Sequence, residues 1–155
     1  MKNSRNAFFC ELEGAYNEKI LLGCMYRSPN SSKENIENML KTIKKEELKS
    51  YDIVCIAGDF NYPKVKWNGV NTGDNEIFVE SLNDAFLTQK VTKPTRNVRM
   101  YQQANIVDLI LVNDETLISE IVHCPPLGAS DHDVLFFQIN TPRRKKKEEK
   151  KKSIT

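Results

Sequence analysis

Long apolar runs are missing from this sequence. No stretch reaches the roughly 18 consecutive apolar residues that a membrane-spanning helix needs. Near the start, the apolar segment Phe8-Phe9-Cys10 is interrupted at once by Glu11, which leaves too short a core for a secretory signal peptide. We therefore expect no membrane association, and an intracellular location that is nuclear or cytoplasmic.

Cysteine is also scarce, and its spacing excludes the common cysteine-based sites. No C-x-x-C pair occurs, so neither zinc binding nor a redox motif is indicated. Three of the cysteines lie within apolar runs, which predicts buried free thiols in a reducing compartment in place of disulfides. The four positions are Cys10, Cys24, Cys55 and Cys124.

Most of the chain has no excess of positive charge, because the basic side chains are concentrated at its C-terminal end. The formal net charge is +2, but residues 143–152 (RRKKKEEKKK) carry eight basic and two acidic side chains, so the remainder has a net charge of −4. We expect one domain over residues 1–140 and a basic tail over residues 141–155. The tail fits a solvated, disordered segment; nuclear localisation and nonspecific attraction to nucleic acid are the alternative interpretations.

Apolar periodicity predicts interleaved strands and helices. Residues 8–12 and 19–26 predict an antiparallel hairpin, and a core strand is expected over residues 53–57. Ser31 with Glu34 matches a capping box for a helix over residues 32–49, and Asp74 is expected to cap a second helix. Further strands are predicted over residues 107–112, 120–123 and 134–139. This order indicates an α/β layered sandwich built on mixed sheet.

The most informative stretch is IVCIAGDFN, residues 53–61. Its apolar run reads as a core strand that leaves the sheet at Gly58. In an extended chain, Asp59 and Asn61 project from one side and Phe60 from the other, so a rigid sheet would present a carboxylate and a carboxamide together. The alternative is a strand end where Asp and Asn only hydrogen-bond the backbone.

Two more apolar runs are bordered by reactive groups. Asp108 interrupts the run 107–112, and Ser130-Asp131-His132 precedes the run that begins at Val134. A carboxylate that enters an apolar strand needs a compensating partner, so we predict a hydrogen bond from His132 to Asp108 that fixes the imidazole tautomer. Without Asp108, a structural role for His132 would be favoured, and His123, which has no motif around it, is assigned that role.

Five short motifs together carry a family resemblance. YRSP at 26–29, GDFN at 58–61, KPTR at 93–96, VDLIL at 107–111 and SDH at 130–132 resemble, in this order, segments of the endonuclease/exonuclease/phosphatase superfamily. YRSP and PTR make the endonuclease domain of non-LTR retrotransposons the most similar group. The resemblance implies a DNase I-like fold and Mg²⁺-dependent hydrolysis of DNA phosphodiesters.

The resemblance also assigns catalytic roles. It implies that Asp59 orients or deprotonates the attacking water and that Asn61 holds the water and a phosphate oxygen. It implies that His132, oriented by Asp108, donates a hydrogen bond to the scissile phosphate. Tyr26 matches a tyrosine that contacts the phosphate, with an aromatic residue at the end of an edge strand as the equal alternative.

Binding roles follow from the same comparison. Asp131 resembles a residue near the metal, and Mg²⁺ commonly uses only one or two carboxylates. Arg27 and Arg96 are expected either to hold backbone phosphates or to be solvated. DNA is the expected partner, and no obligate protein partner is indicated.

One part of the family pattern is missing. Family members carry an earlier Asn and a metal-binding Glu, and neither Glu11 nor Glu13 matches that motif. We therefore expect the later part of such a domain, with Mg²⁺ weakly held and supercoiled DNA nicked poorly or not at all. The alternatives are a catalytically inactive remnant with weak nucleic-acid binding, and a phosphodiesterase or phosphatase of the same superfamily.

Overall fold

A computed structural model describes residues 6–96 and 104–141 of the chain. The predicted basic tail, apart from Thr141, lies outside the described residues. The helices are α1 (Lys33–Ile43) and α2 (Asp74–Asp84), with short 3-10 helices η1 (Glu46–Ser50) and η2 (Glu115–Leu117). The strands are β1 (Ala7–Glu13), β2 (Lys19–Tyr26), β3 (Ile53–Asp59), β4 (Thr88–Gln89), β5 (Asp108–Val112), β6 (Val122–Cys124) and β7 (Val134–Phe136).

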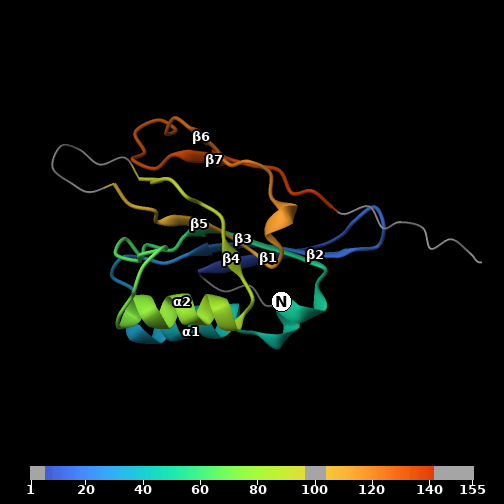
Figure 1. Cartoon of the computed structure of the whole chain (residues 1–155), viewed down its shortest axis with the longest axis horizontal. Coiled ribbons are helices and arrows are strands. Elements are labelled where there is room, and N and C mark those ends of the chain that lie inside the picture. Colours follow the sequence, from blue (N-terminus) through green and yellow to red (C-terminus); the bar gives the residue numbers. More distant parts are fainter. Residues whose placement is uncertain (1–5, 97–103, 142–155) are drawn as a thin grey trace, which may run out of the picture.

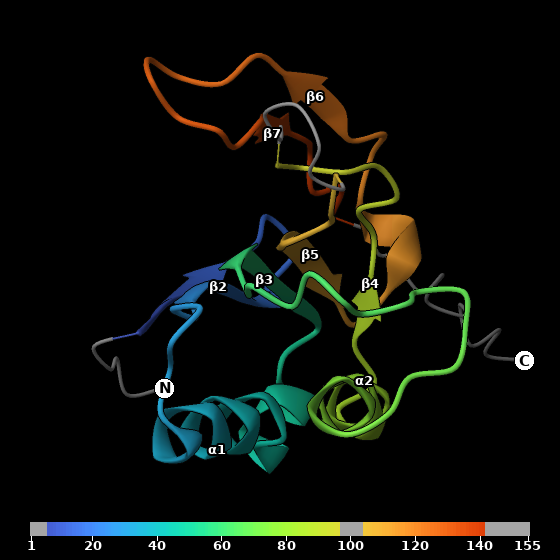
Figure 2. The same ribbon diagram turned by 90° about the vertical axis from the view of Figure 1, so that its left-hand side faces the viewer.

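A five-stranded mixed sheet of order β1-β2-β3-β5-β4 lies at the centre of the molecule. β2 and β3 are parallel, and the other neighbouring strands are antiparallel. Both helices cover one face of this sheet, while the two-stranded sheet β6-β7 lies over the opposite face (Figures 1 and 2). The predicted layered α/β sandwich with mixed sheet is therefore confirmed. Within the described residues, no helix is both long and apolar enough to cross a membrane.

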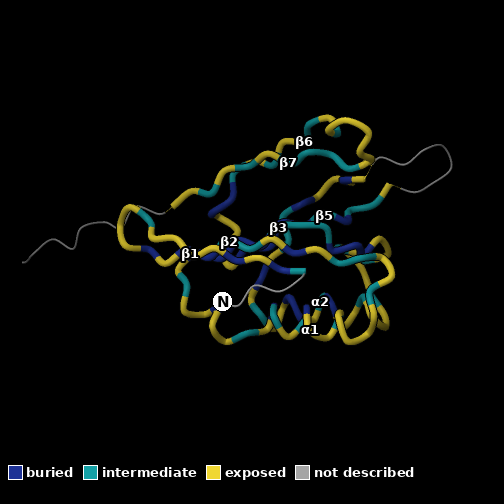
Figure 3. The backbone as a smooth tube through the Cα atoms, turned by 180° about the vertical axis from the view of Figure 1, so that it is seen from behind, coloured by how far each residue is buried: buried dark blue, intermediate teal, exposed yellow. Residues whose placement is uncertain are grey.

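The two faces of the sheet bury separate sets of apolar side chains. Toward the helices, Leu21, Ile56 and Leu111 pack with Phe78 of α2, all of them essentially inaccessible to solvent. On the other face, a smaller cluster that includes Cys55 packs beneath β7. Figure 3 shows the buried backbone concentrated in the central strands and on the inner sides of the helices. The strands are thus held rigidly from both sides, which fixes the position of their ends.

The sheet face over β1 and β2 is only partly covered. Phe8 and Leu12 of β1 are 61% and 46% exposed, and Cys10 and Cys24 are exposed beside them. All four cysteines are free, as predicted, but the prediction that they are buried is wrong for Cys10 and Cys24. Their apolar runs do form strands; β7, however, packs over the inner strands and leaves this outer part of the face open.

The helix ends differ from their predicted positions. Ser32, not Ser31, caps α1, since its side chain accepts a hydrogen bond from the Asn35 amide. The helix ends at Ile43 and not near Lys49, because the chain becomes extended at Lys45 and a separate 3-10 turn buries Leu48. α2 begins at Asp74, but its N-cap is Gly73 at φ 59°, so Asp74 is the first helical residue and not the cap.

The ends of several strands also differ from their predicted positions. The hairpin of β1 and β2 is confirmed, with Phe9 opposite Gly23. β3 does not leave the sheet at Gly58: its pairing continues through Asp59. The two-residue β4 was not predicted. β6 is shifted toward the C-terminus and is shorter than the predicted strand over residues 120–123, and β7 ends before the predicted end at residue 139. Such short strands carry too few residues for an alternating pattern to show.

Candidate active site

Three candidate residues lie side by side at the ends of adjacent strands. Tyr26 of β2 pairs with Asp59 of β3, and Asp59 pairs in turn with Asp108 of β5. Tyr26 and Asp59 are the last residues of their strands, whereas Asp108 is the first residue of an antiparallel strand. All three therefore lie where these neighbouring strands have a common end. Strand register therefore places a phenol and two carboxylates in one row.

The environment of Asp59 disfavours its ionisation. Partial burial is the main cause that raises the pKa of Asp59, and the nearby Asp108 carboxylate raises it further. His132 and the hydrogen bonds from Asn61 act in the opposite direction. A carboxylate with a raised pKa is a stronger proton acceptor than an ordinary aspartate, which suits it to act as a general base.

Asn61 folds back onto Asp59 through a left-handed turn. It adopts φ 51°, a conformation that asparagine tolerates better than most residues. Its amide N–H donates to Asp59 Oδ1 at 3.0 Å, and its Nδ2 donates to Asp59 Oδ2 at 2.8 Å and to the Arg27 carbonyl at 2.8 Å. The predicted meeting of the two side chains occurs, but through this turn and not through an extended chain.

His132 and Asp108 form the predicted hydrogen bond. His132 Nδ1 lies 2.8 Å from Asp108 Oδ2, and both side chains are mostly buried. An ionised Asp108 accepts from Nδ1–H, so the proton is held on Nδ1 and Nε2 is left for a ligand. This is the arrangement that orients an imidazole for catalysis.

Thr95 completes this pair and was not singled out individually. It is fully buried. Its hydroxyl donates a hydrogen bond to Asp108 Oδ2 at 2.6 Å and accepts hydrogen bonds from the backbone amides of Asp108 and Val107. The segments that carry Thr95 and His132 are held together by a backbone bridge between Arg96 and His132. The KPTR motif was the signal that could have identified Thr95.

Asp131 lies beside the cluster and not within it. Its carboxylate accepts a hydrogen bond from Arg96 Nε at 2.7 Å, which lowers the pKa of Asp131, and its Oδ1 lies 3.8 Å from His132 Nε2. Arg96 already neutralises this exposed carboxylate, so a metal role for Asp131 stays a prediction.

A different group of side chains fits a cation. Asp59, Asp108 and His132 each offer a ligand atom, and these atoms lie within 4.8 Å of one another. His132 Nδ1 is engaged by Asp108, and Mg²⁺ prefers oxygen ligands, so the two carboxylates are the suitable donors. Their mutual repulsion is what a divalent cation would relieve.

Tyr26 and Arg27 lead from this row to the neighbouring surface. The Tyr26 side chain is 51% exposed, but β2 lies between β1 and β3, so the alternative of an edge-strand aromatic is excluded. Arg27 is not simply solvated: its Nη1 donates to the Asn61 carbonyl at 2.6 Å, and its guanidinium lies 4.2 Å from the centre of the Tyr62 ring.

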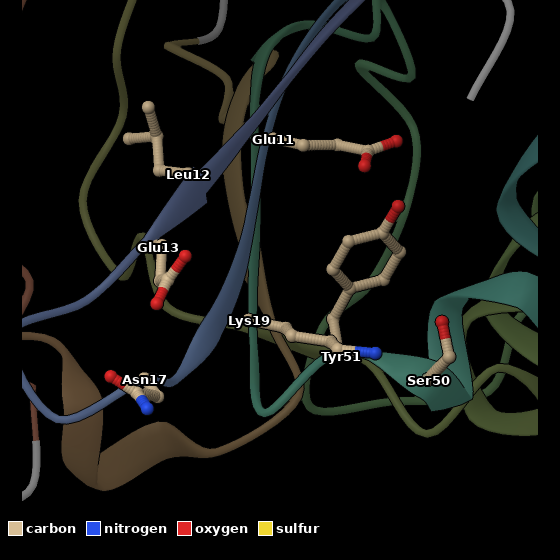
Figure 4. A pocket seen from close by; sticks show the side chains of 7 residues that line it. All are labelled: Glu11, Leu12, Glu13, Asn17, Lys19, Ser50 and Tyr51. Carbon is tan, nitrogen blue, oxygen red and sulfur yellow. The ribbon is translucent and has the colours of Figure 1, made fainter.

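A pocket at the other end of the sheet is remote from these groups. It is lined by residues of β1, β2 and η1, and Figure 4 shows the Tyr51 hydroxyl directed toward the Glu11 carboxylate. A hydrogen bond to Glu11 raises the pKa of Tyr51. Glu11 pairs with Leu21, five residues along β2 from Tyr26, or roughly 16 Å at the usual strand rise. Glu11 therefore cannot join Asp59 in one metal site.

The fold and this row of groups define a DNase I-like protein of the endonuclease/exonuclease/phosphatase superfamily. The sequence model of the endonuclease-reverse transcriptase family matches residues 20–136, and the chain belongs to that family. The resemblance found in the five motifs is thereby confirmed. No curated protein matches the sequence.

Solved structures show the same fold. The endonuclease domain of TRAS1, a telomere-specific non-LTR retrotransposon, superposes with a TM-score of 0.67 at 22% identity over 92% of this chain. The catalytic domain of Xenopus laevis APE2 superposes with a TM-score of 0.51 at 12% identity over 89% of the chain. The chain spans 65% of the TRAS1 domain and 57% of the APE2 domain.

Replacing Thr95 with valine is expected to lower any activity of the site by about 10- to 100-fold, the usual effect of removing a group that orients a functional side chain. Valine removes one of the two donors to Asp108 Oδ2 and leaves two amides without their acceptor, so the free energy of unfolding should also fall by about 1–3 kcal/mol. Activity and urea unfolding measure the two effects. Thr95→Ser, which keeps the hydroxyl, should restore most of both; failure of serine to do so would contradict the role of the hydroxyl.

Proposed function

We propose that this chain hydrolyses phosphodiester bonds of DNA as a Mg²⁺-dependent endonuclease. The observation that carries the proposal is the row of Asp59 and Asp108 on paired strands, with His132 held by Asp108 and Asn61 held against Asp59. Cleavage of a phosphodiester needs an activated water, charge stabilisation on the phosphoryl oxygens and a fixed scissile group. The row offers a residue for each of these needs.

Each residue has a distinct part in the proposed reaction. Asp59, whose pKa is raised, accepts the proton of the attacking water, and Asn61 fixes the orientation of its carboxylate. As the water oxygen bonds to phosphorus, the P–O bond to the leaving strand breaks, and the leaving oxygen takes up a proton from solvent. In its doubly protonated form, His132 donates from Nε2 to a phosphoryl oxygen while its Nδ1–H stays hydrogen-bonded to Asp108. Tyr26, exposed in the same row, contacts the phosphate. Bound near Asp59 and Asp108, Mg²⁺ would supply charge stabilisation for the phosphoryl oxygens.

The choice of DNA rests on the family and on the motifs. The matching family is described as endonuclease-reverse transcriptase, and the similar TRAS1 domain as an endonuclease of a retrotransposon. YRSP and PTR, the motifs typical of the retrotransposon group, are both present. A DNA substrate requires the protein to act in a compartment that holds DNA, which agrees with the predicted nuclear or cytoplasmic location.

Incubation of the purified chain with supercoiled plasmid tests the proposal. We expect slow conversion to nicked circles, at a rate that still rises across the millimolar range of Mg²⁺, because two aspartates alone would hold the ion weakly. EDTA should stop the reaction, and an Asp59→Asn chain purified in the same way should control for contaminating nucleases.

Two other results would point to the alternatives. Binding of plasmid without nicking at any Mg²⁺ concentration would indicate a catalytically inactive remnant. Release of phosphate from soluble phosphate esters without DNA cleavage would indicate a phosphodiesterase or phosphatase.

A further inference from the structure

A second pocket adjoins the candidate active site and has no role in the proposed reaction. It has a volume of about 530 Å³ and is formed by the segment that follows β2, the loop after β3, the start of α2 and Arg96. Two of its lining residues also belong to the neighbourhood of the reactive groups: Asn61 binds Asp59, and Arg96 binds Asp131. A ligand that crosses the active site along this edge of the sheet would therefore enter the pocket.

Positive charge dominates the lining. Arg27, Lys64 and Arg96 line the pocket, and Asp74 is the only carboxylate among its lining residues. Arg96 is paired with Asp131, whereas Arg27 hydrogen-bonds only carbonyl groups and Lys64 has no ion pair, as far as the described residues show. Two cationic side chains thus remain uncompensated in the pocket, which suits an anion.

Two buried donors in the pocket lack protein partners. The Tyr62 side chain is 4% exposed, and within residues 6–96 and 104–141 no group hydrogen-bonds to its hydroxyl or to Arg27 Nε. The pKa of Tyr62 is raised, mainly by burial. Arg27 lowers this pKa and Asp74 raises it further, so the hydroxyl lies close enough to both lining residues to interact with their charges. Leaving buried donors unsatisfied is costly, and an acceptor in this pocket would relieve that cost.

The known contacts of these residues explain only part of the arrangement. Arg27 Nη1 holds the Asn61 carbonyl, and the Tyr62 ring stacks on Phe78 at 4.0 Å between ring centres. A phenylalanine at position 62 would make the same ring stacking. The hydroxyl and Arg27 Nε are the atoms that packing does not require.

We propose that this pocket binds a backbone phosphate of the DNA strand next to the scissile one, with Tyr62 and Arg27 as donors and Lys64 as a neutralising cation. The proposal rests on the proposed function, because the scissile phosphate at Asp59 and His132 fixes which phosphate comes next along the strand. Its contribution is substrate positioning: a second anchored phosphate sets the register of the strand across the active site.

Affinity for a short fluorescein-labelled DNA duplex, measured by anisotropy in EDTA, tests the proposal with matched variants. Tyr62→Phe and Lys64→Gln should each weaken binding about fivefold to tenfold, and Lys64→Gln should lower the salt dependence by about one phosphate contact. Tyr51→Phe, in the pocket of Figure 4, and Lys41→Gln, on the exposed side of α1, should bind like the unaltered chain. The melting temperature of Tyr62→Phe should not fall, because its hydroxyl has no protein partner.

The results separate this proposal from the proposed function. Unchanged affinity in both Tyr62→Phe and Lys64→Gln would overturn the phosphate pocket, even if the chain nicks plasmid. Weakened binding in both variants by a chain that does not nick plasmid would overturn the catalytic proposal and keep the pocket. Lys64 is exposed on the surface, so its variant stays informative if Tyr62→Phe fails to fold.

Discussion

Replacement of Asp59 by asparagine is expected to reduce plasmid nicking by about 10²- to 10⁴-fold, the range associated with loss of a general base. Asparagine keeps the shape of the side chain but cannot accept the proton of the attacking water. The fold should survive: partial burial and the Asp108 charge both raise the pKa of Asp59, so its ionised form opposes folding at neutral pH. Single-turnover nicking and thermal unfolding of the variant measure the two effects.

The same pKa shift predicts the pH dependence of the reaction. Ionised Asp59 is required, so activity should fall as the pH drops through its raised pKa, and the acidic limb should lie above the pH at which an ordinary aspartate titrates. Folding stability should change in the opposite direction, because the penalty for ionising Asp59 is fully present above the raised pKa and disappears on acidification. Near-normal nicking by Asp59→Asn, with no nicking by an Asp108→Asn chain purified in the same way, would assign the base to another residue.

Replacement of Gly58 by alanine is expected to destabilise the fold by about 3 kcal/mol or more, and thereby to destroy the site. Gly58 adopts φ 150° beside β2, where an added Cβ would lie 1.8 Å from the Met25 carbonyl oxygen. That oxygen belongs to the backbone of the neighbouring strand and cannot move without opening the pairing of Tyr26 with Asp59. Urea unfolding of the variant measures the loss.

Gly128→Ala is the matched control for this substitution. Gly128 has φ 59° but nothing within 4 Å of the position of an added Cβ, so only the backbone penalty of about 1–2 kcal/mol applies. Equal losses in the two variants would show that the close approach of β2 to Gly58 is not what the glycine provides.

The glycine and the aspartate act together. Because Gly58 has no Cβ, β3 can lie close beside β2 at this position. The pairing of the two strands therefore continues through Asp59 and does not end two residues earlier. Asp59 therefore sits on rigid, doubly paired backbone, next to Asp108 on one side and Tyr26 on the other. Two carboxylates directly opposite each other are unfavourable for folding, so the site retains a local strain that a cation or a proton relieves.

The sequence by itself determined the layered α/β class, the bounds of β2 and the pairing of His132 with Asp108. These features depend on local information: apolar periodicity marks a buried strand, and a carboxylate inside such a run requires a partner. The order of the five motifs likewise identified the family without knowledge of any contact.

Only the tertiary structure decided which groups meet. The row of Tyr26, Asp59 and Asp108 follows from the register of strands far apart in the chain, and register depends on packing across the whole sheet. Thr95 joins the row because its loop lies beside His132, and the pocket of Arg27, Tyr62 and Lys64 forms where four separate segments converge. A sequence lists such residues one by one, whereas their juxtaposition exists only after long-range pairing has closed the intervening chain.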